Sequence, residues 1–512
     1  MDKPNILVIM SDQLRYDALG CSGNPVVRTP NIDQLAESGA RFTNAYTPNP
    51  LCVPARASFT TGCYPHKSAG SKQNNGQIRA GFPTIGEEMK QRGYETYAMG
   101  KLHYTPYQPP GTERVTHGLD TVELSESGRY VNRFDPSGKL TGLEEYLDYL
   151  QEVGWGGYTR GHGLGNNDIF PAPSPIPKEH YVDTWVAERT LHHLQQHMVD
   201  SPDKPFFMWT SFPKPHSAYD PPRPYDQWYH PHDMPEPVGS AALLRERGLD
   251  LLDREYRKYG WDSLSPQAHK VIKAYYYGLV ALQDELIGRI IEFLETNGLR
   301  DNTIVVFTSD HGDMLGDFGQ YFKKVFYKGS VKIPLLISYP PAIQPGLVTD
   351  ELAGLQDLLP TLLGLAGDPL VCTVDGIDLQ PMLLEGKAVR EYFVSQSNND
   401  PAAQRYMVAD KQWKYVYHTY GGVEELYDLA ADPDELKNLS GKAEPESEAA
   451  KQQRNMRQYL IEWCMINGDH TMLDQGDLLR IERDREPSSA TAALHPKSAG
   501  KSVLGHFGRR FV

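Results

Sequence analysis

The chain has 512 residues, of which 39% are apolar and 23% are charged, a composition typical of a globular protein and not of a disordered one. Its 66 acidic residues outnumber its 51 lysines and arginines, which gives a net charge of −15. Such a molecule would repel a phosphate backbone, so nucleic acid is not an expected partner. The length is sufficient for one large domain and a second, smaller one.

No apolar run approaches the roughly 18 residues that cross a bilayer, and the first unbroken apolar stretch covers only Ile6 to Met10. The sequence therefore predicts neither a membrane span nor a signal peptide. The five cysteines show no Cys-x-x-Cys spacing, which fits reduced thiols better than disulfides or a zinc site. We expect a cytoplasmic protein, with a removed leader as the alternative.

Short apolar runs alternate with helical patterns along residues 1–389, which we interpret as one catalytic domain. Runs that are apolar throughout, as expected of strands covered by helices on both faces, are residues 6–10, 206–209, 303–308 and 334–337. Helices are predicted to begin at Pro30, after a capping box at Thr84 and Glu87, and to cover residues 181–198 and 266–299. This alternation predicts the α/β class with a mostly parallel sheet flanked by helices.

The pattern changes after about residue 390. Short β-rich runs at residues 406–409 and 413–418 precede a helical stretch at residues 449–464, so we predict a smaller C-terminal α+β subdomain over residues 390–470. The tail, residues 471–512, shows no sustained periodicity and is either mobile or ordered against a neighbour, which permits a homo-oligomer.

Two long stretches have few regular signals and many aromatic residues. They cover residues 104–180 and 217–265. Stretches of this length inside a compact domain are usually functional. We expect them to contribute the roof of a pocket.

The segment Cys52-Val53-Pro54-Ala55-Arg56 predicts a helix that begins near Cys52, because proline suits a first turn, and that ends at Gly62. Arg56 lies four residues after Cys52 and therefore on the same helix face. A helix N-terminus and a guanidinium together favour an anion. A buried cysteine beside a surface salt bridge would explain the segment equally well, whereas a phosphatase-type thiolate would place the arginine six residues after the cysteine.

A second group of polar residues follows the predicted strand at residues 303–308. Ser309-Asp310-His311 lies where the carboxyl end of a parallel strand faces the ligand crevice, and Asp12 has the equivalent place after the first strand. Carboxylates and an imidazole without thiolates favour a hard divalent cation such as Ca²⁺, Mg²⁺ or Mn²⁺. A capping aspartate and a hydrogen-bonded loop histidine would explain either site alone, but less well the two together.

Basic residues also follow strand ends at three places. Lys101 and His103 are two residues apart and so lie on one side of an extended segment. His216 follows the run that begins at Phe206, and Lys323 follows the Asp310 segment. Any one of these residues, taken alone, could be a surface residue. Their repeated placement after strand ends favours the hypothesis that they share an anionic ligand.

With these residues, the chain resembles the sulfatase family of the alkaline phosphatase superfamily. The motifs that carry the resemblance, in the family's order over residues 4–439, are Pro4-Asn5-Ile6 leading to Asp12, Cys52-Val53-Pro54-Ala55-Arg56, Gly100-Lys101-Leu102-His103, Ser309-Asp310-His311-Gly312, Asp357-Leu358-Leu359-Pro360-Thr361 and Glu425-Leu426-Tyr427-Asp428-Leu429. The resemblance implies an alkaline-phosphatase-like fold and hydrolysis of a sulfate monoester.

The resemblance also implies a modified nucleophile and a metal. Cys52 would be oxidised by a formylglycine-generating enzyme, and the hydrated formylglycine would attack sulfur. One divalent metal, expected to be Ca²⁺, would be held by Asp12, residue 52, Asp310 and His311, with Gln13 as a further candidate ligand. The sulfate oxygens would be neutralised by Arg56, Lys101, His216 and Lys323.

Proton transfers and the substrate pocket follow from the same resemblance. His103 would lie beside the second hydroxyl of the hydrated residue 52, and His216 or Lys323 beside the leaving oxygen as proton donor. Asn74 is a candidate substrate ligand. Asn75 is its competitor, because the loop can be aligned with the family's pattern one residue either way. The substrate would be a small-molecule or carbohydrate sulfate ester.

Two positions depart from the commonest family pattern. Gln13 stands where many members have a second aspartate, and His311 where many have asparagine, which is similar to the choline-sulfatase and phosphonate-monoester-hydrolase branch. A phosphonate monoester or phosphodiester hydrolase is therefore the alternative activity, although Lys101 and His103 favour sulfate. A non-catalytic protein that binds sulfated ligands is a third hypothesis, and the complete motif around Cys52 counts against it.

Overall fold

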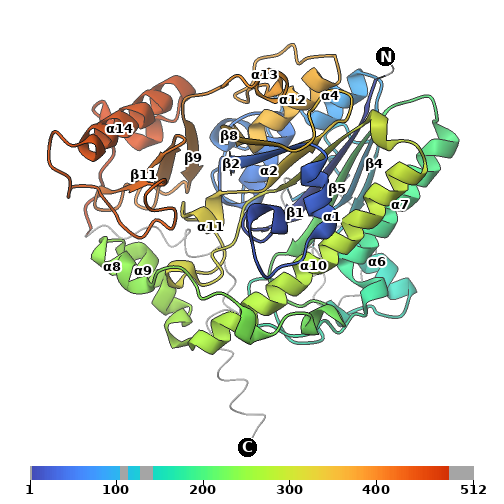
Figure 1. Ribbon diagram of the computed structural model, residues 1–512, viewed down its shortest axis with the longest axis horizontal. Helices are drawn as coiled ribbons and strands as arrows, with labels where there is room; N and C mark the ends of the chain where they lie inside the picture. The colour runs from blue at the N-terminus through green and yellow to red at the C-terminus, as the bar shows by residue number, and fades with distance from the viewer. Residues whose placement is uncertain (1–2, 104–112, 127–141, 484–512) are drawn as a thin grey trace, which may run out of the picture.

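The computed structural model describes residues 3–103, 113–126 and 142–483. Its centre is an eight-stranded sheet in the order β4-β3-β5-β1-β6-β7-β2-β8, which runs through the middle of Figure 1. The strands of this sheet are β1 (Asn5–Asp12), β2 (Ala40–Tyr46), β3 (Glu95–Gly100), β4 (Thr121–Leu124), β5 (Phe206–Pro215), β6 (Thr303–Ser309), β7 (Leu335–Ser338) and β8 (Leu347–Gly354).

The sheet is mostly parallel, as predicted, and β7 is the exception. It pairs antiparallel with both β6 and β2. The chain leaves β6 at its carboxyl end, forms the segment that contains Asp310 and Lys323, and enters the sheet again from that same edge. Because no helix carries the chain back across a face of the sheet, β7 has to run in the opposite direction.

Helices cover both faces of the sheet (Figure 1). One face packs on α1 (Pro30–Glu37), α6 (Glu145–Glu152), α7 (Val182–Asp200) and α10 (Pro266–Thr296), and the other on α2 (Cys52–Thr61), α4 (Ile85–Gln91), α12 (Leu358–Leu365) and α13 (Gln380–Glu385). The side chains of β1 alternate between the two cores: Leu7 and Ile9 face the first, whereas Ile6 and Val8 face the second. This double burial explains why the strand is apolar throughout.

The predicted helices at residues 181–198 and 266–299 are confirmed by α7 and α10. One half of the predicted capping box is present, because the Thr84 hydroxyl accepts a hydrogen bond from the Glu87 N–H at 3.3 Å. The remaining short helices are α3 (Pro65–Ser68), α8 (Ala241–Glu246), α9 (Asp250–Lys258) and α11 (Lys328–Val331). Residues 217–265, predicted to have little regular structure, thus contain two short α-helices and three 3-10 turns.

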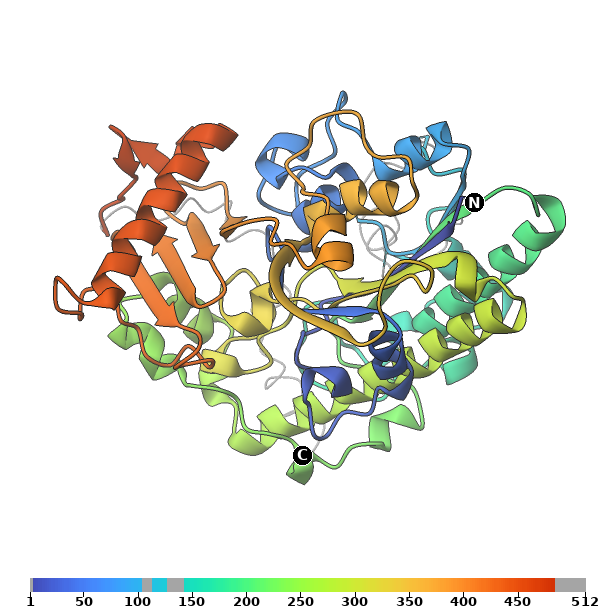
Figure 2. The same cartoon turned by 45° about the horizontal axis from the view of Figure 1, so that its top comes forward.

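The C-terminal part is a second, antiparallel sheet in the order β12-β11-β10-β9. Its strands are β9 (Phe393–Ser397), β10 (Arg405–Ala409), β11 (Trp413–His418) and β12 (Val423–Asp428), and α14 (Glu448–Asn467) packs across it, as Figure 2 shows. A small hairpin of β13 (Leu473–Asp474) and β14 (Asp477–Leu478) follows. The α+β character predicted for this part is confirmed.

Ile481 pairs with Tyr420 of the subdomain, so the first residues of the predicted tail are ordered. Residues 484–512, the rest of that tail, lie outside the described residues, as do residues 104–112 and 127–141 of the first aromatic stretch. Within the part of the chain that the structure describes, no helix is long and apolar enough to cross a membrane.

Candidate active site

The carboxyl ends of β1 and β6 bring the first two acidic residues together. The strands pair in register from Asn5 opposite Thr303 to Ser11 opposite Ser309, so Asp12 and Asp310 follow directly at the same edge. The two loops are also bonded to each other, because the Gln13 N–H donates to Asp310 Oδ1 at 3.0 Å. Asp12, Asp310 and His311 are all fully buried.

Cys52 completes a group of four potential metal ligands. It is the first residue of α2, and its Sγ lies 3.2 Å from His311 Nε2 and 3.8 Å from Asp12 Oδ1. One donor atom each from Asp12, Cys52, Asp310 and His311 all lie within 4.8 Å of one another. The sequence prediction that these residues meet at one sheet edge is therefore confirmed.

The protonation of His311 suits a ligand. Its Nδ1 donates to the Gly312 carbonyl at 3.0 Å, which leaves the lone pair of Nε2 directed at the cluster. Burial lowers the pKa of His311 to about 3, although Asp310 opposes the shift, so the ring is neutral. Burial would raise the pKa of Asp310, but the charges of Arg56 and Lys101 hold it well below its ordinary value. Two carboxylates and a neutral imidazole fit a divalent cation.

Arg56 lies behind the cluster, with none of its side chain exposed. Its Nε donates to Asp310 Oδ2 at 2.9 Å, and Nη1 donates to the Lys101 carbonyl at 2.5 Å and to the Ser211 hydroxyl at 2.8 Å. Nη2 lies 3.7 Å from Asp12 Oδ2 and has no hydrogen-bond partner. Arg56 therefore contacts both carboxylates, and its buried Nη2 keeps an unsatisfied N–H.

Two lysines extend the positive charge around the cluster. Lys101, 1% exposed, is ion-paired with Asp12 Oδ2, and Lys323 donates to the side-chain oxygen of Gln13. The amide nitrogen of Gln13 donates to Asp313. Gln13 therefore lies beside the cluster and is bonded to Asp310 through its backbone N–H, and its role as a metal ligand stays a prediction.

Both candidate histidines are buried near these groups. His103 follows Lys101, and its backbone N–H donates to Glu126 Oε1 at 2.8 Å. His216 follows β5, and its Nδ1 donates to the Ser217 carbonyl at 2.8 Å. The roles predicted for them in proton transfer stay predictions.

The loop that contains Asn74 lies against the start of α2. Asn74 Oδ1 accepts from the Val53 N–H at 3.1 Å, whereas Asn75 Oδ1 accepts from the Ser71 hydroxyl at 2.6 Å. Of the two competing asparagines, Asn74 is therefore the one beside residue 52. Asn75 instead lines a groove of about 420 Å³ that opens along the same loop.

Two groups that support the site had no signal of their own in the sequence. Ser211, which receives Arg56 Nη1, differs from other serines only in its place at the end of an apolar run. Glu126 lies in a segment without periodicity, yet its Oε1 accepts both the Leu102 and the His103 N–H groups. Only the pairing of β4 with β3 brings this carboxylate to the Lys101 turn.

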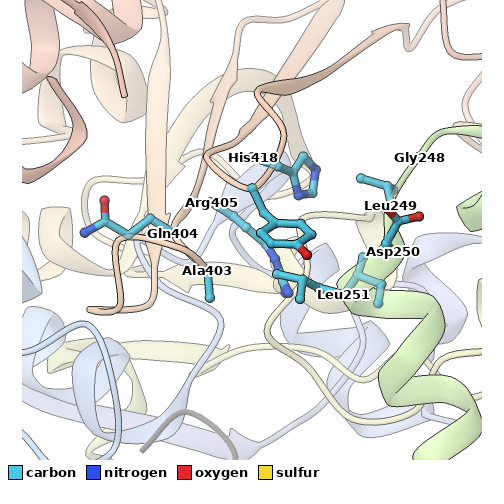
Figure 3. A pocket seen from close by; sticks show the side chains of 10 residues that line it. Gly248, Leu249, Asp250, Leu251, Ala403, Gln404, Arg405 and His418 are labelled. Atoms are coloured by element: carbon cyan, nitrogen blue, oxygen red, sulfur yellow. The ribbon is translucent and has the colours of Figure 1, made fainter. Parts of the chain in front are cut away.

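The aromatic stretch at residues 217–265 was expected to contribute to the roof of a pocket. At its far end, α9 meets the C-terminal sheet around a cavity of about 10 Å³, enough for roughly one water molecule. Figure 3 shows Leu251 facing Arg405 and His418 across this cavity. The contact attaches the subdomain to the catalytic domain and is too small for a substrate.

Comparison with known proteins agrees with this geometry. The pattern of the sulfatase family matches residues 4–368, which contain every candidate site residue. The chain belongs to the sulfatase family. The pattern described as N-sulphoglucosamine sulphohydrolase, C-terminal, matches residues 316–462. The resemblance seen in the sequence, and the alkaline phosphatase superfamily that it implied, are thereby confirmed.

Individual sulfatases are similar along most of the chain. An arylsulfatase of Clostridium perfringens is 33% identical over 453 residues, 85% of this chain and 90% of that protein. A choline-sulfatase of Rhizobium meliloti is 31% identical over 449 residues, 86% and 82% of the two chains. A phosphonate monoester hydrolase of Agrobacterium radiobacter has a TM-score of 0.76 at 25% identity, covering 91% and 96%. The family and these relatives support a sulfatase enzyme that hydrolyses sulfate esters.

Proposed function

We propose that the protein hydrolyses a sulfate monoester with residue 52 as a formylglycine nucleophile and one divalent metal at Asp12, residue 52, Asp310 and His311. The observation that carries the proposal is the buried position of Cys52 in the first turn of α2, with Sγ 3.2 Å from His311 Nε2 and all four donors within 4.8 Å. Calcium is the metal that we expect, with magnesium or manganese as alternatives, because two carboxylates dominate the donor set.

The modified residue and the metal would supply the nucleophile. Hydrated formylglycine carries two hydroxyls in place of one thiol, and a bound cation lowers the pKa of a hydroxyl that it contacts. The orphaned Nη2 of Arg56 is the donor in the site that such a hydroxyl could satisfy. Conversion of Cys52 requires a formylglycine-generating enzyme as a partner during maturation.

The side chains of the chain itself would orient and neutralise the sulfate group. Lys101 and Lys323 bring two ammonium groups to the cluster edge, and preorganised cations are most effective where charge develops in the transition state. His216 would donate a proton to the leaving oxygen, and His103 would accept one from the second hydroxyl of residue 52. Arg56 would keep both carboxylates oriented throughout.

Two variants of residue 52 test this mechanism. Cys52→Ser should bind substrate but fail to turn over repeatedly, because a single hydroxyl cannot expel sulfate as an aldehyde hydrate can, and Cys52→Ala is the control without any nucleophile. The measurement is steady-state hydrolysis of 4-nitrophenyl sulfate together with the mass of the peptide that contains residue 52. Sustained multiple turnover by Cys52→Ser would overturn the mechanism.

Phosphonate monoester or phosphodiester hydrolysis is the second candidate activity. It is favoured by Gln13 and His311 in place of the commoner aspartate and asparagine, and by the fold similarity to the phosphonate monoester hydrolase. Rates on 4-nitrophenyl sulfate, choline sulfate, sulfated sugars and a phenylphosphonate monoester distinguish the two. A kcat/KM for the phosphonate that exceeds every sulfate would reverse the order of the candidates.

Partners and location complete the proposal. The substrate is a small-molecule or carbohydrate sulfate ester, and the proposed location is the cytoplasm, in keeping with five cysteines that show no Cys-x-x-Cys spacing. Assembly into a homo-oligomer through residues 471–512 is part of the same proposal. Cell fractionation and light scattering test the location and the assembly.

A further inference from the structure

A buried ion pair joins two parts of the chain that are 397 residues apart. Lys72 lies in the loop between α3 and α4, and Asp469 follows α14; each is 3% exposed. Lys72 Nζ lies 3.3 and 3.2 Å from the two carboxylate oxygens of Asp469 and donates to the hydroxyls of Tyr406 at 2.8 Å and Thr471 at 3.2 Å. The lysine is therefore surrounded by groups of the C-terminal part.

The backbone of Lys72 is held on both sides as well. Its N–H donates to Asn399 Oδ1 at 2.8 Å, and its carbonyl accepts from Asn49 Nδ2 at 3.0 Å. Asn49 precedes Cys52 by three residues, and its own carbonyl accepts from the Leu51 N–H at 2.8 Å. The N–H of Lys72 is thus bonded to the C-terminal part, and its carbonyl is bonded to the segment that leads into residue 52.

The second connection to residue 52 comes two residues later, where Asn74 accepts the Val53 N–H. This N–H is one of the first in α2, where helix donors have no partner within the helix. A displacement of Lys72 would disturb both asparagines. Asn49 bonds directly to the Lys72 carbonyl, and Asn74 follows Lys72 by two residues.

We propose that the Lys72–Asp469 pair is a positioning device through which the C-terminal subdomain holds Asn74 and Asn49 against the segment that carries residue 52. Lys72 and Asp469 are positioning residues in this proposal, since neither contacts the four donors directly. The catalytic part of the test rests on the proposed function, whereas the structural part does not.

The physical chemistry of the pair makes the device rigid. A buried ammonium or carboxylate without its partner is strongly unfavourable, so loss of either member leaves a charge that the surroundings cannot satisfy. Burial lowers the pKa of Lys72, and Asp469 opposes this. The loop therefore has one favourable place, which is the place that puts Asn74 beside Val53.

The chain offers a control in α3, directly before the loop. Lys67 Nζ donates to Asp375 Oδ1 at 2.6 Å and to Asn467 Oδ1 at 2.9 Å, so it also ties the loop to the end of α14. The backbone of Lys67, however, bonds to Tyr64 and Arg79 and not to the segment before residue 52. Lys67→Met removes an ion pair that is more exposed, with the lysine side chain 29% accessible, without loosening Asn74.

The first experiment is a double-mutant cycle on the formylglycine-bearing protein with 4-nitrophenyl sulfate as substrate. We expect Lys72→Met to lower kcat/KM at least tenfold and Lys67→Met less than twofold. In a protein that already carries Asn74→Ala, Lys72→Met should lower kcat/KM by no more than a further threefold. The effects of two substitutions on the activation free energy are not additive when one residue acts through the other. Independent, multiplicative losses would overturn the proposal. Asp469→Asn, which keeps an oxygen for Lys72 and Tyr406, is the substitute if Lys72→Met does not fold.

The second experiment needs no activity. Amide hydrogen exchange of a peptide spanning residues 51–59 should be faster in Lys72→Met than in wild type and unchanged in Lys67→Met, because the Val53 N–H loses its acceptor only in the former. Unchanged exchange in both variants would overturn the proposal. A wild type that hydrolyses no sulfate ester but shows the expected exchange would refute the proposed function and leave the positioning role intact.

Discussion

Glu126 is expected to hold the turn that presents Lys101 and His103. Its carboxylate is buried, and Oε1 accepts the N–H groups of Leu102 at 3.1 Å and His103 at 2.8 Å. His103 has a φ of 51°, a left-handed conformation that a histidine adopts only when the surroundings maintain it. Glu126→Ala should therefore release the turn as well as destabilise the fold.

The size of the effect follows from these two bonds. A hydrogen bond to a charged group contributes about 1.5 to 3 kcal/mol, so loss of both in Glu126→Ala should lower the free energy of unfolding by about 3 kcal/mol or more. Glu126→Gln keeps an acceptor oxygen but loses the charge, and neutral hydrogen bonds contribute about 1 kcal/mol each. The glutamine variant should therefore lose about half as much.

Denaturant unfolding and steady-state kinetics on 4-nitrophenyl sulfate measure both consequences. We expect kcat/KM to fall at least tenfold in Glu126→Ala and less than threefold in Glu126→Gln. Glu145→Ala is the matched control, because Glu145 Oε2 accepts the Leu124 N–H at 2.6 Å, at the end of β4 and not from the N–H groups of Leu102 and His103; it should lose stability and keep its kcat/KM. Equal losses of activity in the alanine and glutamine variants would refute this reasoning.

Three further predictions concern charge, pH and the tail. Lys101→Ala should lower kcat/KM for sulfate esters by about two to three orders of magnitude, the scale for one preorganised contact, in the same kinetic assay. Burial raises the pKa of Asp183 to about 7, so the folded state binds a proton that the unfolded chain does not, and stability falls as pH rises from about 4 to 7. Asp183→Asn should accordingly raise Tm more at pH 8 than at pH 5, and an equal change at both would contradict the assignment. Deletion of residues 471–512 should lower Tm, because it removes the Thr471 and Ile481 contacts, yet leave the metal content unchanged by elemental analysis.

Much of the catalytic domain could be predicted from local pattern. The unbroken apolar run at Ile6–Met10 indicates a strand with two buried faces, and parallel strands of this kind place Asp12 and Asp310 at one edge of the sheet. The first turn of α2 could be predicted too, because Pro54 and Gly62 define where a helix begins and ends. These signals come from residues that are neighbours in the chain, whereas the pairing of β1 with β6, which puts the two aspartates side by side, does not.

Other features of the site depend on which distant segments meet. Asn74 and Asn75 are equivalent in the sequence, and only the packing of their loop on Val53 distinguishes them. The partners of the Gln13 amide, Asp313 and Lys323, lie about 300 residues away and are likewise set by the packing. A side chain with several polar partners in reach adopts the arrangement that satisfies most of them, and this choice cannot be read from spacing.

The sequence by itself determined the sheet, the helix that begins at Cys52 and the family, because apolar periodicity and short motifs act over a few residues. The tertiary structure alone decided how the site is supported: Glu126 under the Lys101 turn, and Lys72 paired with Asp469 across 397 residues. Buried charges have to find partners wherever the fold brings them, and such a pairing depends on the completed packing of both domains and not on any local pattern.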